Sequence, residues 1–254
     1  MAGTGRWIHL HTVDSTNEYL KRNGEELPDW TLVTASHQTA GKGRQGKVWQ
    51  DCEAQSFLGS WLLKGLSEEQ LKLLPMAAGL AVSQALEQQG MKPVWLKWPN
   101  DVVTRFPNGF VKLAGILCES RFSDGRFWAV CGIGLNLTQT REQLMQDGLK
   151  QAGSLQSIWG KAPDAEQVRQ ALDEQLFALL GNPEIGAEQI LEQYSQVCIT
   201  LGQEVLIEQN GQKIPATAQQ VEPDGTLLCR TQTQQTLRVH AGEVSVRGHR
   251  GYVD

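Results

Sequence analysis

Hydrophobic and polar residues alternate in short segments along the first half of the chain. The alternating run at residues 7–13 and the apolar runs at residues 30–38 and 56–63 predict strands, because side chains two apart share one face of a strand. Three further apolar runs, PVWLKW, FVKLAGILCES and FWAVCGIGLNL, are separated by the turn signals FPNG and SDG. Together these runs predict an antiparallel or mixed sheet.

The stretch after the first predicted strand carries a helix-start signal. Ser15 and Glu18 have the spacing of a capping box, and Gly24 is a suitable helix end. We therefore expect a short helix with Ser15, Thr16 and Asn17 at its N-terminus.

A second helix-start signal lies at Ser67 and Gln70. It opens a helical region that ends at Gly90. We expect Pro75 to break or restart this helix, because proline removes a helix hydrogen bond. Residues 140–198 also place apolar side chains at helical spacing, which predicts further helices after the sheet.

The pattern changes after Cys198. Short segments again alternate apolar and polar residues, and Asn210–Gly211 and Asp224–Gly225 are hairpin-turn signals. Strands at this spacing predict a small β-barrel of about 50 residues. We place the domain boundary near Thr200, which gives a first domain of residues 1–199 and a second of residues 200–254.

Composition narrows the class of protein. The 254 residues are 40% hydrophobic and 20% charged, as in an ordinary globular chain. The five cysteines include no C-x-x-C pair, so the sequence indicates neither a disulfide framework nor a zinc site. The sequence has no leader-like segment and no run of about 18 apolar residues, so we expect a cytoplasmic protein without a membrane anchor. The net charge of −5 argues against a dedicated nucleic-acid binder.

One segment is locally basic against this acidic background: QTAGKGRQGKVWQD, residues 38–51. It interleaves three glycines with three cations and ends near a tryptophan; these residues are Gly41, Gly43, Gly46, Lys42, Arg44, Lys47 and Trp49. The dinucleotide fingerprint and the P-loop both fail here, because a strand follows the loop and no Gly-Lys-Ser/Thr occurs. A nest of free N–H groups with cations for a phosphate or carboxylate remains possible, and so does a solvated basic turn.

Two lysines lie in strand-like, apolar surroundings. Lys97 precedes a turn at Pro99 that leaves Asn100 and Asp101 at the strand exit, where they suit ribose hydroxyls, a hard cation such as Mg²⁺, or a simple turn. Lys112 lies inside a run that reads as a central strand. It either snorkels from an edge strand or points into a cleft that receives an anion.

Several glycines fall where a ligand can approach a strand closely. Gly115 follows Lys112, and Gly132, Gly134 and Asn136 share one face of their strand. This face leaves room for a flat molecule, or alternatively allows tight packing of the sheet.

The four stretches together resemble the biotin protein ligase family. The family pattern Gly-Arg-Gly-Arg-x-Gly-Arg-x-Trp, Lys-Trp-Pro-Asn-Asp, Lys-Leu-x-Gly-Ile-Leu and Gly-Ile-Gly-x-Asn is present here as GKGRQGKVW, KWPND, KLAGIL and GIGLN, in that order. The upstream DSTN and Gln38 also match, and the resemblance spans essentially the whole chain. The departures are Lys42 and Lys47, where arginine is usual, so the bidentate fork is lost at both positions.

The resemblance implies an α+β fold: a catalytic domain with a mixed sheet, related to class II aminoacyl-tRNA synthetases, followed by a small SH3-like barrel. It implies that biotin and ATP react to biotinyl-5'-AMP, with Mg²⁺, and that biotin passes to a lysine of a biotin carboxyl carrier protein. We further expect a monomer or homodimer, and the acidic composition and the lack of a long apolar run predict binding to neither nucleic acid nor membrane.

The resemblance also assigns site residues. We expect Lys112 and Arg44 to be catalytic through charge stabilisation, and Asp101 to be a ligand of Mg²⁺. The expected biotin-binding residues are Ser15, Thr16, Asn17, Gln38, Gly41, Lys42, Gly43, Arg44, Lys112, Gly115, Gly132 and Gly134. The expected ATP-binding residues are Lys42, Arg44, Lys47, Trp49, Asn100, Asp101, Lys112, Asn136 and Arg247.

Three competing classes are weaker. A lipoate or octanoate ligase shares the fold, but its loop has consecutive glycines and an aromatic-His-Asp end, unlike GKGRQGKVWQD. A biotin-sensing repressor carries an N-terminal helix-turn-helix of roughly 60 residues, whereas DSTN begins here at Asp14. A tRNA-handling protein conflicts with the acidic composition.

Overall fold

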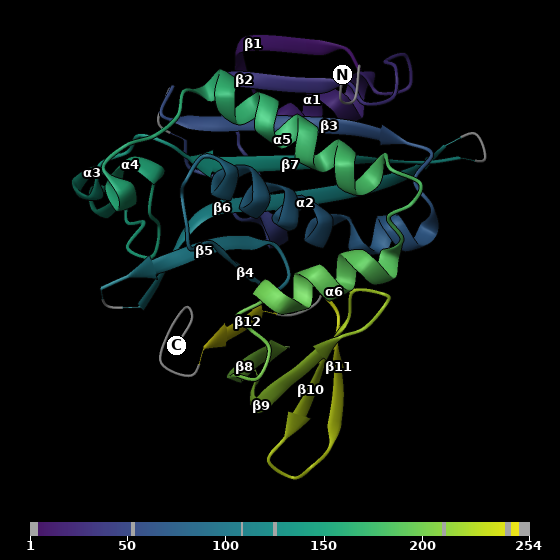
Figure 1. The fold of residues 1–254 in the computed structure, drawn as a ribbon, viewed down its shortest axis with the longest axis vertical. Helices are drawn as coiled ribbons and strands as arrows, with labels where there is room; N and C mark the ends of the chain where they lie inside the picture. Colours follow the sequence, from purple (N-terminus) through teal and green to yellow (C-terminus); the bar gives the residue numbers. More distant parts are fainter. Residues whose placement is uncertain are drawn as a thin grey trace.

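A seven-stranded sheet forms the larger part of the molecule (Figure 1). The computed structural model describes residues 5–51, 54–107, 109–123, 126–209, 212–241 and 245–248. The strands are β1 (Trp7–Val13), β2 (Leu32–Gln38), β3 (Ser56–Lys64), β4 (Trp95–Lys97), β5 (Asp101–Phe106), β6 (Gly109–Ser123) and β7 (Arg126–Asn136). Their order is β1-β2-β3-β7-β6-β5-β4, with β1 and β2 parallel and the other neighbours antiparallel. The expected mixed sheet is therefore confirmed.

Strand β5 is not among the strands predicted from the sequence. This strand is only six residues long and follows the Asn-Asp turn directly, so no separate apolar run marks it. Val102 and Val103 are fully buried, and a register shift between them bends the strand where it leaves the turn.

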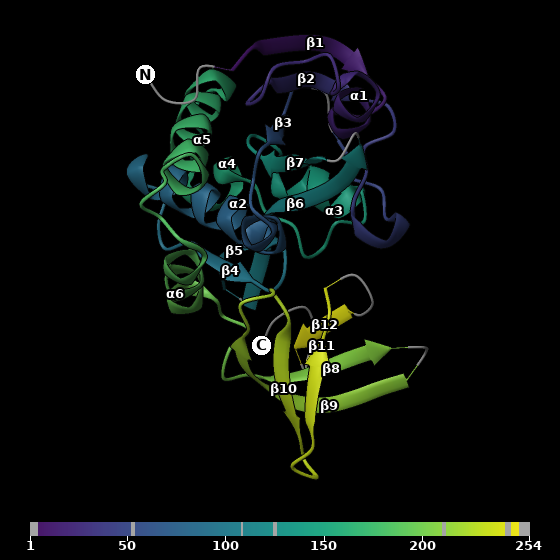
Figure 2. The same ribbon diagram turned by 90° about the vertical axis from the view of Figure 1, so that its right-hand side faces the viewer.

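Helices cover both faces of the large sheet (Figure 2). They are α1 (Thr16–Asn23), α2 (Glu68–Gln88), α3 (Arg141–Gln146), α4 (Leu155–Trp159), α5 (Ala165–Leu180) and α6 (Ala187–Val197), with a 3₁₀ turn at Arg44–Gly46. Helices α2, α5 and α6 lie on one face and bury the main core around Trp61 and Leu176. Helix α1 packs on the opposite face, where Leu20, Leu62 and Val130 form a smaller core.

Helix α2 confirms one capping prediction and corrects another. Ser67 and Gln70 form the expected capping box, and the helix ends before Gly90, which has a φ of +74°. The expected break at Pro75 is wrong, because the helix is continuous through it. Burial of Leu73, Met76 and their neighbours against the sheet outweighs the intrinsic cost of proline, about 3 kcal/mol.

The capping box expected at the start of α1 is also wrong. The Ser15 side chain makes no capping hydrogen bond. Instead, Oε1 of Gln38 on β2 accepts from the backbone N–H of Thr16 at 2.7 Å, and Oδ1 of Asp14 accepts from the N–H of Ser15 at 2.8 Å. The Glu18 carboxylate points elsewhere, to Lys21 and Lys42. Tertiary partners have replaced the local cap.

The second sheet contains the five C-terminal strands. They are β8 (Glu204–Gln209), β9 (Gln212–Val221), β10 (Leu227–Thr231), β11 (Thr236–Val239) and β12 (Ser245–Gly248), in the antiparallel order β11-β10-β9-β8-β12. This is the expected small SH3-like domain. The turn at Asp224–Gly225 is confirmed, with Gly225 at a φ of +80°, whereas the Asn210–Gly211 turn lies outside the described residues.

Trp98 joins the two sheets. Its backbone N–H donates to Oγ1 of Thr200 at 3.0 Å, and its Nε1–H donates to the carbonyl of Gly225 at 3.2 Å. Because Trp98 directly follows β4, this contact fixes the small sheet beside the exit of that strand.

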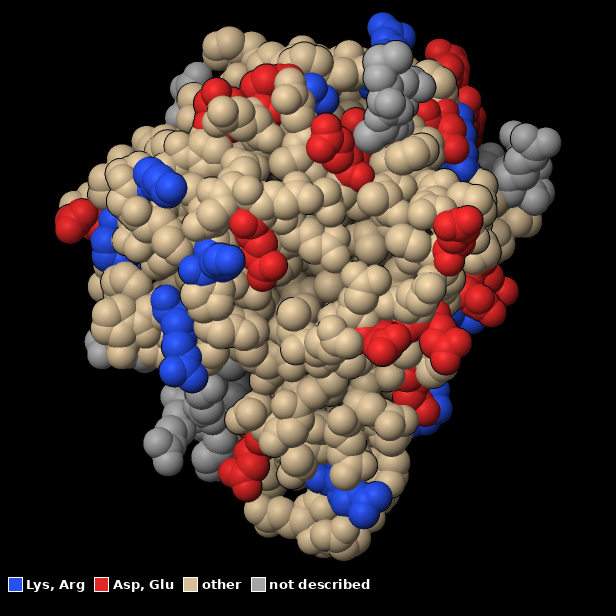
Figure 3. Space-filling model, in the orientation of Figure 1, with Lys and Arg blue, Asp and Glu red and all other residues tan. Residues whose placement is uncertain are grey.

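Figure 3 shows the charged side chains on one face of the molecule. On the face shown in Figure 3, lysine and arginine side chains are scattered among acidic ones. In the part of the chain that the structure describes, no helix is both long and apolar enough to cross a membrane.

Candidate active site

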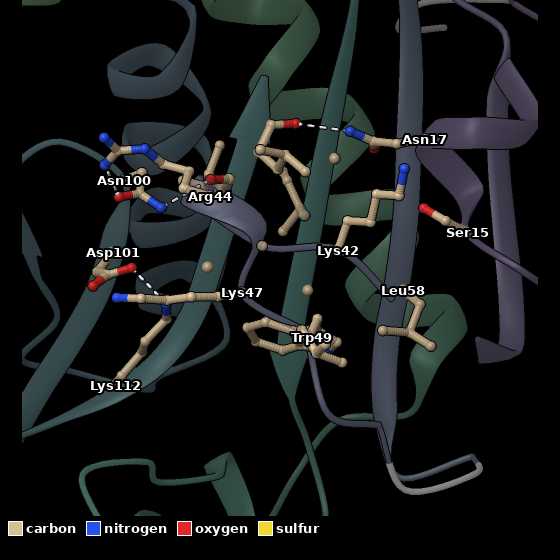
Figure 4. A pocket seen from close by; sticks show the side chains of 18 of the residues that line it. Ser15, Asn17, Lys42, Arg44, Lys47, Trp49, Leu58, Asn100, Asp101 and Lys112 are labelled. Atoms are coloured by element: carbon tan, nitrogen blue, oxygen red, sulfur yellow. Dashed lines mark hydrogen bonds and ion pairs between the residues drawn. The ribbon is translucent and has the colours of Figure 1, made fainter. Parts of the chain in front are cut away.

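A cavity of about 230 Å³ lies on the large sheet, between the glycine loop, the start of α1 and the turn after β4 (Figure 4). It brings together residues far apart in the sequence. Of the expected site residues, those that line it are Ser15, Thr16, Asn17, Gln38, Lys42, Gly43, Arg44, Lys47, Trp49, Asn100, Asp101, Lys112, Gly115, Gly132 and Gly134.

The cavity is strongly cationic. Its lining contains five cations and one carboxylate; these residues are Lys42, Arg44, Lys47, Lys97, Lys112 and Asp101. This excess of positive charge occurs in a chain whose net charge is −5. Such a concentration of cations in one cavity favours an anionic ligand.

One end of the cavity is lined by neutral polar side chains. Oε1 of Gln38 accepts from the N–H and from Oγ1 of Thr16, at 2.7 and 3.1 Å. The hydroxyl of Ser60 lies 2.6 Å from Oδ1 of Asn17 and 2.7 Å from Oγ1 of Thr16. Ser15 is buried beside them. These side chains hold one another in fixed positions, which suits recognition of a small polar group.

Gly132 is required beside this polar end. A Cβ atom at Gly132 would lie 2.1 Å from Oδ1 of Asn17. Because such a distance is a severe overlap, only glycine allows β7 to approach Asn17 this closely.

The tryptophan of the loop lies on the glycine face of the sheet. A Cβ atom at Gly134 would lie 2.6 Å from the Trp49 ring, and one at Gly115 would lie 2.9 Å from it. The sequence left open whether this face makes room for a flat molecule or allows tight packing. In the structure the flat group against Gly134 is the indole of Trp49 itself.

The glycine loop is a small hairpin. The N–H groups of Gly43 and Trp49 donate to the carbonyls of Lys47 and Gly41, at 2.7 and 3.0 Å. Gln45 adopts a φ of +55° at the tip. The sequence left open a nest of free N–H groups and a solvated basic turn. Because these N–H groups bond within the hairpin, the positive charge that the loop offers comes mainly from its side chains.

Arg44 enters the cavity from this hairpin. Its Nη1 donates to Oδ1 of Asn100 at 2.8 Å, and Nδ2 of Asn100 donates to the carbonyl of Ile116 at 2.9 Å. Nη2 of Arg44 is buried without a hydrogen-bond partner among the described residues. Burial lowers the pKa of Arg44, and the charge of Asp101 opposes this shift. A buried guanidinium with an unused donor is suited to an incoming anion.

Lys112 points into the cavity rather than out of an edge strand. Its Nζ lies 2.6 Å from Oδ1 of Asp101 on the neighbouring strand, and 5.7 Å from the centre of the Trp49 ring. The structure thus places Lys112 in a cleft, and the arrival of an anion there stays a prediction.

Some expected site residues lie outside the cavity lining. Gly41 is buried behind it, where a Cβ atom would meet the Trp49 carbonyl at 2.7 Å. Asn136 is buried, and its Nδ2 donates to the carbonyl of Gly153 at 3.0 Å. The side chain of Arg247 lies outside the described part of the structure.

The structure adds residues that the sequence analysis did not assign to the site. Lys97 lines the cavity and its side chain is buried. Its placement in an apolar strand was the available signal. Ser60 orients Asn17 from 43 positions away, and no sequence pattern indicates that contact.

A resident metal centre is not indicated. Among the described residues, no group of three or more His, Cys, Asp or Glu side chains could hold an ion. Asp101 is the one carboxylate in the cavity lining, and it is paired with Lys112.

Comparison with known proteins decides the family. A model of the biotin/lipoate A/B protein ligase family matches residues 10–136, and a model of the biotin protein ligase C terminal domain matches residues 200–247. The biotin--[acetyl-CoA-carboxylase] ligase of Mycobacterium tuberculosis is 34% identical over 96% of this chain and 90% of its own length. The chain belongs to the biotin protein ligase family.

Two further relatives of this biotin protein ligase show the range of the family. The biotin protein ligase of Aquifex aeolicus, solved in complex with biotin and ATP, superposes with a TM-score of 0.74 at 29% identity, over 96% of this chain and 99% of that one. The bifunctional ligase/repressor BirA of Bacillus subtilis is 33% identical over 63% of this chain, but over only 48% of its own length.

Proposed function

We propose that this ligase activates biotin with ATP to biotinyl-5'-AMP and transfers the biotinyl group to one lysine of a biotin carboxyl carrier protein. The observation that carries the proposal is the two-part cavity: neutral polar side chains lie at one end, and Arg44, Lys47 and Lys112 lie away from them, near Asn100 and Asp101 (Figure 4). Biotin has a polar urea edge and a carboxylate, and ATP brings further negative charge. The relative solved with biotin and ATP supports this assignment.

The urea edge of biotin suits the polar end. Ser15, Asn17 and Gln38 offer donors and acceptors there, in fixed geometry. Buried Leu58, which pairs with Gly134 and shares its face of the sheet, supplies an apolar contact for the rest of the bicycle. The carboxylate of biotin then faces the cationic end.

In the adenylation step the biotin carboxylate attacks the α-phosphate of ATP, and pyrophosphate leaves. Negative charge gathers at the phosphate, and we assign its stabilisation to Lys112 and Arg44, without proton transfer. The unused Nη2 donor of Arg44 supports this role. Trp49 is assigned to the adenine, with Lys47 and Asn100 near the phosphates and ribose.

In the transfer step the amine of the acceptor lysine attacks the acyl carbon of the adenylate. The bond from that carbon to the phosphate oxygen breaks, so an amide forms and AMP leaves. Lys42 and Lys47 are exposed residues of the loop that borders the cavity, and we assign the approach of the acceptor to this side.

Several finer assignments belong to the same proposal. Magnesium would enter with the phosphates of ATP, with Asp101 as the protein carboxylate nearest to them. Asn136 and the Arg247 side chain stay assigned to the nucleotide. We keep the domain boundary between residues 199 and 200, a cytoplasmic location, a monomer or homodimer, and no role in nucleic-acid binding.

The alternative is a lipoate or octanoate ligase of the same fold. A plain acyl chain offers no hydrogen-bonding group to the four side chains at the polar end, which are Ser15, Thr16, Asn17 and Gln38. Burying these side chains against an apolar chain would leave them without a hydrogen-bonding ligand, which disfavours that substrate.

Mass spectrometry of an isolated carrier domain tests the whole reaction. We expect one biotinyl group on one lysine, dependent on both ATP and biotin. Replacement of that lysine by arginine in the carrier should abolish the mass shift. Labelling that requires no ATP, or that occurs with lipoate, would contradict the proposal.

A further inference from the structure

Glu18, in the first turn of α1, contacts the glycine loop from outside. Its Oε1 accepts a hydrogen bond from Nζ of Lys42 at 2.7 Å and another from Nζ of Lys21 at 2.6 Å. The Glu18 side chain is 20% exposed and that of Lys42 is 49% exposed, so the pair is partly shielded from water. This ion pair ties the loop to the helix whose N-terminus lines the polar end of the cavity.

The contact continues from Glu18 to the cavity itself. Lys21 also donates to Oε1 of Glu119 on β6 at 2.7 Å, and Oε2 of Glu119 accepts from Nδ2 of Asn17 at 2.9 Å. A chain of charged and polar hydrogen bonds therefore runs from the loop, through α1, to Asn17. The loop and the polar end of the site are held in one network.

Lysine at position 42 fits this contact. The lysine ammonium is a compact charge that meets a single carboxylate oxygen, whereas the arginine fork is built for two. Oε1 of Glu18 is already shared with Lys21. The hydrogen bonds from Lys21 and then Lys42 lower the pKa of Glu18, which agrees with a charged pair. Lys42, which replaces the usual arginine of the family pattern, thus has a specific partner in Glu18.

We infer that Glu18 is a positioning residue that holds the loop of residues 41–49 over the cavity through Lys42, and so slows the escape of the acyl-adenylate. The inference rests on the proposed function, because it names what the loop retains. Glu18 does not belong to the cavity lining of the described residues, so it acts through Lys42.

Release of labelled adenylate tests this role. Wild type and variants are loaded with radiolabelled biotin and ATP and passed through a desalting column, and the bound label is followed after dilution into unlabelled biotin. Glu18→Gln and Lys42→Gln should each release the adenylate roughly two- to fivefold faster, the effect of a partly exposed ion pair. The double variant should be no faster than the faster single variant, since both remove one contact.

Two controls separate the loop contact from a general effect on α1. Lys21→Gln removes the link to Glu119 but keeps the contact between Glu18 and Lys42, so it should accelerate adenylate release less than Glu18→Gln does. In about 1 M salt, where charges are screened within roughly 3 Å, Glu18→Gln and wild type should converge. Convergence would not occur if the substitution merely distorted the helix.

The outcomes of this experiment distinguish failure of the role of Glu18 from failure of the proposed function. If Glu18→Gln releases the adenylate at the wild-type rate, if Lys21→Gln matches its release, or if the single effects multiply in the double variant, the role of Glu18 is overturned. If wild type forms no adenylate at all, the proposed function fails and the inference falls with it.

Discussion

Nζ of Lys112 lies 2.6 Å from Oδ1 of Asp101, and both side chains line the same cavity. The Asp101 side chain is only 12% exposed, so Lys112 pairs with a carboxylate that is nearly buried. An anionic substrate that approaches Lys112 has to share the lysine with Asp101. The pair thus fixes the ammonium group in the cavity before the substrate arrives.

Lys112→Met should reduce adenylate formation by about 10² or more, because it keeps the apolar stem but removes the charge at the phosphate. The variant should also lose stability, since it leaves the Asp101 carboxylate unpaired. Lys112→Met combined with Asp101→Asn should regain melting temperature but not activity. A fall in kcat of less than tenfold in Lys112→Met would show that this lysine is not the stabilising cation.

Gly132→Ala should weaken biotin binding. The new methyl group would lie 2.1 Å from Oδ1 of Asn17 and must displace it. Overpacking of this kind costs about 1–3 kcal/mol, so KM for biotin should rise about tenfold, with a smaller change in KM for ATP. Gly186→Ala, where a Cβ atom meets nothing within 4 Å, is the matched control. An unchanged KM for biotin in Gly132→Ala would argue against the polar end as its site.

Biotin and ATP together should protect the glycine loop from trypsin. Trypsin cuts after lysine and arginine, and the loop offers Lys42, Arg44 and Lys47. The pair of Lys42 with Glu18 is partly exposed, so bound ligands should add to the hold on the loop. Cleavage between residues 42 and 48 should slow when both ligands are added. Lys213, with a side chain 68% exposed in the small sheet, supplies a reference site whose cleavage should not change. Equal protection at both sites would mean that the loop does not close on the ligands.

The ion pair between Asp14 and Arg22 should add stability only above acidic pH. Its hydrogen bond from Arg22 lowers the pKa of Asp14 from 3.8 to about 2. Because the folded pKa lies below the unfolded one, the contribution is present above about pH 4 and is lost as the pH falls toward 2. Melting temperatures of wild type and Asp14→Asn should therefore differ at pH 5 and converge near pH 2. The difference is small, since the pair is largely exposed.

Local sequence signals predicted most strands and helices, and the four motifs predicted which residues share the cavity. Ser67 and Gln70 cap α2 because both partners are local. Ser15 and Glu18 have the same spacing but do not form a box, because Gln38 accepts from the N–H of Thr16 and Lys42 pairs with Glu18, both from elsewhere in the fold.

The features of the site that the sequence did not predict depend on contacts between residues far apart in the chain. Ser60 comes from a central strand to orient Asn17, and nothing in its own neighbourhood marks it. The position of Trp49 on Gly134 likewise depends on how the loop folds back over the sheet. Propensity and motif spacing do not encode such contacts, so the sequence did not predict that Ser60 contacts Asn17 or that Glu18 contacts Lys42.

Biotin-dependent exchange of labelled pyrophosphate into ATP tests the central claim most directly, because it isolates adenylate formation from transfer. Biotin should support exchange, and lipoate and octanoate should not, since Ser15, Asn17 and Gln38 have no partner in a plain acyl chain. Exchange that proceeds equally well with lipoate, or that is absent with biotin, would contradict the account.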